Sequence, residues 1–132
     1  MVSKRLLSRL GIGSAKVDLI LEKQEYSPGE KVTGHFLLIG GIIEQDVKRI
    51  DCHLMVLDKK NGSESILDSL TILSSRSIRP KEVEKIDFKF RLPENLEMSS
   101  SARSYQFKTK LHFDAGVANK DQDIIHVAAQ NI

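Results

Sequence analysis

The sequence has few of the residues that build disulfide scaffolds, membrane spans or aromatic ligand sites. Its 132 residues include one cysteine, Cys52, and no tryptophan, and aromatic residues make up only 5%. A single cysteine excludes an internal disulfide and is typical of proteins in reducing compartments. No stretch approaches the roughly 18 continuous apolar residues of a membrane-spanning helix, and the N-terminus lacks the apolar run of a secretory signal. These absences predict a cytoplasmic protein.

The charged residues are balanced in number and interleaved along the chain. There are 20 basic and 18 acidic residues, which give a formal net charge of +2. A nucleic-acid-binding protein usually shows a concentrated basic footprint, and none is present here, so we expect no nucleic-acid partner. A content of 40% hydrophobic and 29% charged residues is ordinary for a globular protein, and the length fits one domain.

The N-terminal segment 1–12 has helical rather than alternating periodicity. Its apolar residues recur at helix-like spacing, basic residues lie between them, and Gly11 is a stop signal. The apolar residues are Val2, Leu6, Leu7 and Leu10, and the basic residues are Lys4, Arg5 and Arg9. The pattern predicts a short basic amphipathic helix. We expect its apolar stripe to pack on one end of the domain, with contact to an anionic membrane surface as the alternative.

From residue 13 onward apolar and polar residues alternate, which is typical of half-buried antiparallel strands. The alternation predicts strands over about 15–22, 31–39, 47–57, 65–74, 85–92, 105–113 and 124–127. Pro28-Gly29 predicts a type II turn, and Asn61-Gly62 predicts a hairpin. Residues 119–123 are interpreted as a polar turn before the last strand. Residues 13–132 are therefore expected to form one all-β, immunoglobulin-like antiparallel sandwich of seven to eight strands.

Several segments of the chain share residues with one known family. They are residues 11–18, 26–34, 41–47, 78–82, 88–94 and 110–124. The block around Pro28-Gly29 is the most specific of them, and segment 57–78 matches least. On these residues the chain resembles the bacterial sporulation-control (stage zero M) family, whose members have arrestin-like sandwiches. The resemblance implies an arrestin-like domain over residues 13–132.

The resemblance also implies a role. It implies a non-catalytic cytoplasmic regulator or adaptor that influences entry into sporulation through protein contacts, with no cofactor. Members of the family usually carry a second sandwich, so a function that needs a cleft between two domains is not carried over to this chain.

Two short motifs invite a ligand-binding interpretation, and both lack the required context. Segment 11–16 has clustered glycines, but a phosphate loop joins a strand to a helix, whereas here a predicted helix precedes a predicted strand. Asn119, Asp121 and Asp123 begin a calcium-loop pattern, with Asp114 nearby. The template then requires glycine where Ile124 stands and glutamate where Gln130 stands. A turn stabilised by Asx side chains is favoured over a cation held in another geometry.

The candidate nucleophiles and metal ligands are also isolated. The histidines, which are His35, His53, His112 and His126, stand singly in predicted strands without the spacing of a zinc site. Cys52 alternates in register with Ile50 and Leu54, so we expect a buried and unactivated thiol. The serines at 99–101 belong to a predicted loop and not to a nucleophile elbow.

The sequence therefore predicts no catalytic, cofactor-binding or metal-binding residue and no enzyme. The first hypothesis is a protein-binding module whose free edge strands add a partner strand, including one from a second copy of the chain. The alternative is a peripheral membrane-surface adaptor that uses the basic N-terminal helix. A carbohydrate- or small-ligand-binding sandwich ranks last, because such sites usually present exposed aromatic side chains.

Overall fold

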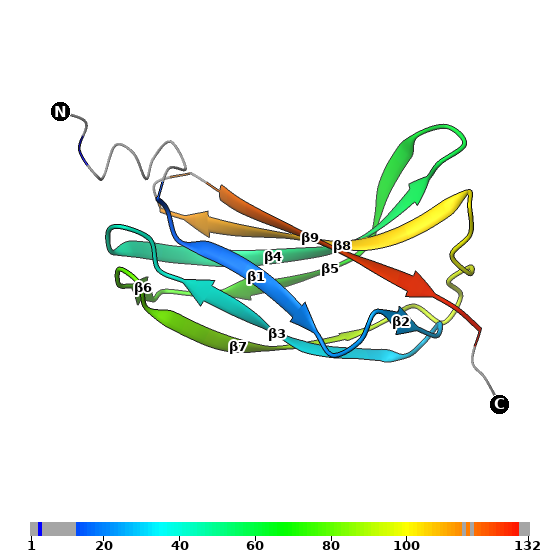
Figure 1. Ribbon diagram of the computed structural model, residues 1–132, viewed down its shortest axis with the longest axis horizontal. Helices are drawn as coiled ribbons and strands as arrows, with labels where there is room; N and C mark the ends of the chain where they lie inside the picture. Colours follow the sequence, from blue (N-terminus) through cyan, green and yellow to red (C-terminus); the bar gives the residue numbers. More distant parts are fainter. Residues whose placement is uncertain (1–2, 4–12, 115, 117, 130–132) are drawn as a thin grey trace.

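The computed structural model describes residues 3, 13–114, 116 and 118–129, and this part of the chain forms nine β-strands (Figure 1). The strands are β1 (Lys16–Leu21), β2 (Glu25–Tyr26), β3 (Lys31–Ile39), β4 (Gln45–Asp58), β5 (Ser63–Leu73), β6 (Ser77–Ile78), β7 (Val83–Arg91), β8 (Arg103–Phe113) and β9 (Ala118–Val127). Of the segment 1–12 only Ser3 is described, so the expected helix there lies outside the described residues. No helix that could span a bilayer occurs in the described residues.

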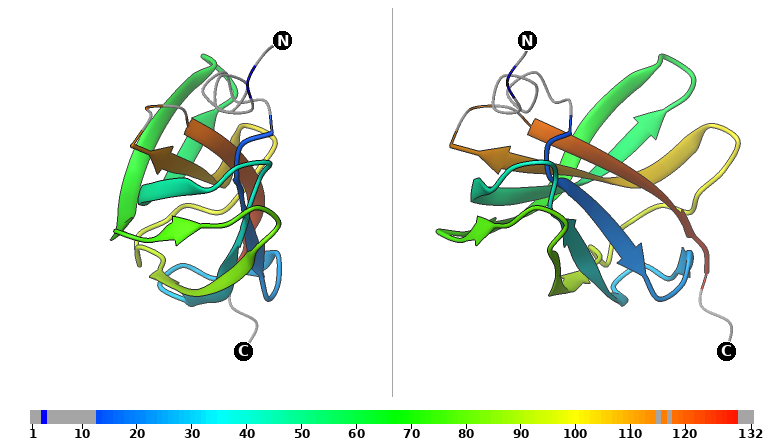
Figure 2. Two further views of the ribbon diagram at one scale, coloured as in Figure 1. Left: turned by 90° about the vertical axis from the view of Figure 1, so that its left-hand side faces the viewer. Right: turned by 60° about the vertical axis from the view of Figure 1, so that its left-hand side comes forward.

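The strands form two sheets. The smaller sheet has the order β1-β3-β7, and the larger sheet has the order β2-β9-β8-β4-β5, with β6 paired to one end of β4. All pairings are antiparallel except the short parallel pairing of β2 with β9. Figure 2 shows the two sheets as separate layers, and Figure 1 shows the β4–β5 hairpin turn rising away from them. The all-β two-sheet architecture that the alternation predicted is confirmed.

The core lies between the sheets and explains the alternation. Along β1, β3, β4 and β8 the buried residues recur largely at alternate positions and their neighbours are more exposed, whereas β5 has no fully buried residue. Phe88 and Phe107, from opposite sheets, meet edge to face with ring centroids 5.5 Å apart, and Phe36 and Phe90 pack beside them. The apolar positions of the alternating pattern therefore form the hydrophobic core.

Two glycines meet specific backbone requirements. Gly29 has a φ of 78° in the turn where the Glu30 N–H donates to the Ser27 carbonyl (3.1 Å), which confirms the predicted turn. A Cβ at Gly34 would lie 2.1 Å from the Ile20 carbonyl oxygen on the neighbouring strand. The two strands approach closely at Gly34, and no larger residue fits there without backbone movement.

The interpretation of residues 119–123 as a turn is wrong. Strand β9 begins at Ala118, so Asn119, Asp121 and Asp123 occupy inward positions of a strand. Polar residues are tolerated at these positions because the facing β1 edge has free backbone N–H groups that need acceptors. The two-residue strands β2 and β6, which carry no alternation of their own, raise the described strand count above the predicted seven to eight.

Candidate functional site

The cysteine and the histidines considered as nucleophiles or metal ligands are dispersed in the structure. The Cys52 side chain is buried, and this burial raises the pKa of its thiol to about 11. The predicted burial of Cys52 is confirmed, and a thiol that stays protonated at neutral pH is a poor nucleophile. His53 Nδ1 lies 2.6 Å from Ser69 Oγ, and His112 Nε2 lies 2.9 Å from Asp51 Oδ2. No histidine joins a cluster of three possible metal ligands in the described part of the chain.

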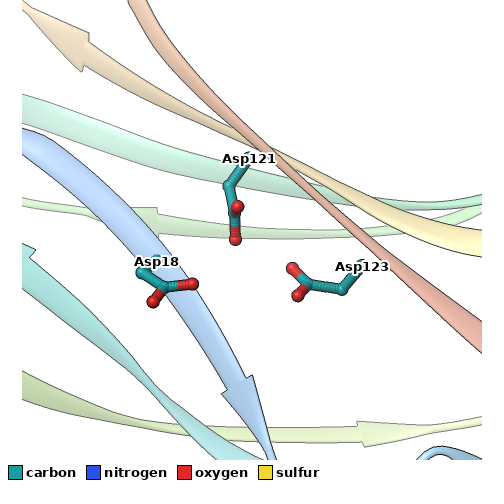
Figure 3. Close-up of side chains that lie close together, drawn as sticks. All are labelled: Asp18, Asp121 and Asp123. Carbon is teal, nitrogen blue, oxygen red and sulfur yellow. The ribbon is translucent and has the colours of Figure 1, made fainter.

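Three carboxylates instead meet at the side of the sandwich where the two sheets approach each other. Asp18 comes from β1, and Asp121 and Asp123 come from β9, with one oxygen of each within 4.8 Å of the others. Figure 3 shows the three side chains pointing toward one another across the gap between β1 and β9. Sequence reasoning singled out two of these residues but not Asp18, because 103 residues separate Asp18 from Asp121 in the sequence.

Side chains of β9 hold the β1 edge in place. The Val17 N–H donates to Asn119 Oδ1 (3.0 Å), and the Leu19 N–H donates to Asp121 Oδ2 (2.8 Å). Both amides face away from β3 and would otherwise lack a partner, which costs free energy when such a group is buried. Asn119 and Asp121 therefore replace the backbone ladder that would join the two strands in one continuous sheet.

Asp123 is electrostatically strained in this cluster. Its Oδ2 atom is buried and has no hydrogen-bond partner among the described residues. Burial is the largest cause that raises the pKa of Asp123, to about 7, and the nearby Asp121 and Asp18 raise it further. Burial and Asp121 also raise the pKa of Asp18. Near neutral pH the cluster therefore holds a proton, which Asp123 can donate to Asp121.

The cluster has the chemistry to hold either a proton or a cation. Three carboxylates are suitable ligands for a hard divalent ion. Asp121 Oδ2, however, already accepts the Leu19 N–H, and proton sharing relieves part of the repulsion. We therefore assign the cluster a structural role in joining β1 to β9, and the absence of a metal site stays a prediction.

A second candidate site is the free edge of the larger sheet at β5. One side of β5 pairs with β4, and β5 ends the strand order of the sheet on its other side. Large apolar side chains are exposed along this strand, namely Ile66, Leu67 and Leu73, and Leu73 is 80% exposed. An edge strand of this kind offers unpaired backbone groups to a partner strand.

Comparisons with known proteins identify the family. The sequence profile of the SpoOM protein family matches residues 3–132. The sporulation-control protein spo0M of Bacillus subtilis is 34% identical over 96% of this chain. The chain covers 51% of that relative, so it spans about half the relative's length.

Solved structures agree with the sequence comparison. The crystal structure of the Bacillus subtilis Spo0M protein superposes with a TM-score of 0.81 and 34% identity, covering 90% of this chain and 51% of that chain. A CARDB domain from Pyrococcus furiosus, solved in complex with di-metal ions, has a TM-score of 0.56 at 13% identity, covering 87% of this chain and 88% of that chain. The second likeness shows the fold alone. The sequence and structural matches together show that the chain belongs to the SpoOM protein family.

Proposed function

We propose that this chain is a non-catalytic, arrestin-like binding domain that takes part in the control of sporulation through protein contacts in the cytoplasm. The family and the spo0M relative support the regulatory role. The observation that supports protein binding is the β5 edge, where exposed apolar side chains accompany an edge that pairs with no other described strand. The chemical groups described above support a role without catalysis, because burial keeps the Cys52 thiol protonated and Asp121 of the carboxylate cluster binds the β1 edge.

The proposal is tested by site-specific photocross-linking in sporulating cells. A photoreactive amino acid replaces Leu73 on the β5 edge, and a matched control replaces Ile124, which is 72% exposed on β9. We expect protein adducts from position 73 and few from position 124, because a partner strand would lie beside β5. Equal adduct formation at both positions, or none at either, would contradict the proposal.

A peripheral membrane role is the second candidate, and the outer face of the smaller sheet favours it. Five cations face outward there, and none forms an ion pair with another described residue. They are Lys16, Lys31, Lys85, Lys89 and Arg91. Asp87 also faces outward there, between Lys85 and Lys89 on β7, so the face carries an excess of basic residues and not basic residues alone. A face with excess positive charge is attracted to anionic lipid. Co-sedimentation with anionic vesicles at low salt, lost in the variant Lys85→Glu/Lys89→Glu, would support this role over the first.

A further inference from the structure

The strand edges of the two sheets differ in how they are protected from pairing. The β1 edge is occupied by the side chains of Asn119 and Asp121, and the end of β9 pairs with β2. The β7 edge carries cations, including Lys85 and Lys89, and charges of this kind oppose the addition of another strand. Strand β5 differs from these edges, because its stretch from Ser69 to Leu73 contains no charged residue and no proline.

Hydrogen bonding shows which backbone groups of β5 face outward. The Ser74 N–H donates to the Lys48 carbonyl (2.9 Å), next to the Arg49–Leu73 register pair. Because antiparallel ladders alternate, Ile72 and Leu70 also direct their backbone groups to β4, whereas Leu73, Thr71 and Ser69 direct theirs away. The Ser69 N–H agrees with this alternation, since it donates to Asp68 Oδ1 (2.8 Å) instead of to β4. A partner strand on this edge would take the place of that exposed acceptor.

The uncharged stretch of β5 is complementary to itself in one antiparallel register. If a two-fold axis passes beside Thr71, Thr71 of one copy lies opposite Thr71 of the other copy, and Ser69 of one copy lies opposite Leu73 of the other. The outward-facing backbone groups of the two copies then face each other. In the same register Leu70 faces Ile72 on the inner side of the sheet. Both of these side chains are half-buried and pack against the core cluster. Pairing would therefore extend the apolar core across the axis without placing like charges opposite each other.

We propose that the partner at the β5 edge is a second copy of this chain, paired antiparallel about Thr71. The pairing joins the larger sheets of two copies into one continuous sheet and covers Leu73. The β4–β5 register shifts at a β-bulge at Leu67, so the regular alternation of outward-facing backbone groups on β5 ends there. The bulge therefore limits the pairing to the Ser69–Leu73 stretch. A two-fold interface of this kind uses the same patch on both copies and closes at a dimer.

The inference rests on the proposed function, because it names the partner of the same edge. Sedimentation equilibrium of the chain over a range of concentrations tests it first. We expect a reversible monomer–dimer equilibrium in the wild type, weakened at least about tenfold in Leu73→Lys, which corresponds to ~1.4 kcal/mol. The control Ile124→Lys removes a similarly exposed aliphatic group and leaves the equilibrium unchanged. A monomeric wild type up to about 1 mM, the range of very weak complexes, would overturn the inference.

The register is tested by cross-linking. The only native thiol, Cys52, is buried, so Thr71→Cys adds one accessible thiol. Across the proposed axis the two Cα atoms would be about 5.5 Å apart, within the range of disulfides. Mild oxidation is expected to give a covalent dimer of Thr71→Cys and none of Ile124→Cys. Equal dimer yields would overturn the register. A monomeric chain that still gives heterologous adducts at position 73 would refute self-pairing and leave the proposed function standing.

Discussion

Replacing Asp123 with asparagine is expected to stabilise the protein above neutral pH. The wild-type carboxyl has a buried Oδ2 that no described residue hydrogen-bonds, and it lies beside Asp121 and Asp18. Asparagine has nearly the same shape, removes the negative charge and can donate its amide N–H to Asp121. The variant therefore removes a repulsion and leaves the hydrogen bond from the Leu19 N–H to Asp121 intact.

The sign and size of the effect follow from the pKa of Asp123, which rises from 3.8 to about 7 in the folded state. Between these values the folded protein keeps a proton that the unfolded chain has lost, so the free energy of unfolding falls as pH rises and stays low above 7. Each pKa unit corresponds to ~1.4 kcal/mol, which sets an upper limit of about 4 kcal/mol. Because Asp123 is only partly buried, we expect about 1–3 kcal/mol.

Urea denaturation followed by far-ultraviolet circular dichroism at pH 4 and pH 8 measures the effect. Asp123→Asn should exceed the wild type in stability by about 1–3 kcal/mol at pH 8, and the advantage should shrink toward pH 4. The control Asp114→Asn changes an exposed aspartate in the turn after β8 and should be neutral at both pH values. A variant that is less stable at pH 8, or whose advantage is the same at both pH values, would refute the assignment of repulsion to this cluster.

Four further predictions concern the core and the cluster. Gly34→Ala should lower the free energy of unfolding by about 2–4 kcal/mol, because the new Cβ collides with the Ile20 carbonyl, and chemical denaturation would show this. Phe107→Ala should cost about 3–5 kcal/mol in the same assay, since its ring packs against aromatic rings of the opposite sheet. Cys52 should react with a thiol reagent at the rate of unfolding, so fast labelling of the native protein would contradict its burial. Millimolar calcium should leave the melting temperature at pH 8 unchanged, and a rise would show that the carboxylate cluster holds a cation.

The sequence allowed most long strands to be predicted because burial on one face imposes an alternation with a period of two. Segment 31–39 has this alternation, and strand β3 spans the same residues. Strand β9 was predicted too short, because Asn119, Asp121 and Asp123 look like turn residues until β1 lies beside them. Local pattern contains no information about such a contact, since the partners are 102 residues apart.

The candidate sites were less predictable than the fold. The Asp18 carboxylate joins the cluster only through tertiary contact, so its position in an alternating strand gave no signal. The free edges were expected from the sandwich architecture, but the strand order was needed to identify β5 as one of them. The lack of charge in the stretch Ser69–Leu73 is visible in the sequence and gains meaning only once that stretch is known to lie at an edge.

The central claim is that the β5 edge is where this domain makes the protein contacts of its regulatory role. Sporulation frequency in a host strain that lacks its own related protein tests this claim most directly, with the chain supplied as wild type, Leu73→Lys or Ile124→Lys. If the claim is correct, Leu73→Lys loses the effect of the wild type on sporulation, whereas Ile124→Lys retains it at equal protein level. A Leu73→Lys chain that is present, folded and as effective as the wild type would contradict the claim.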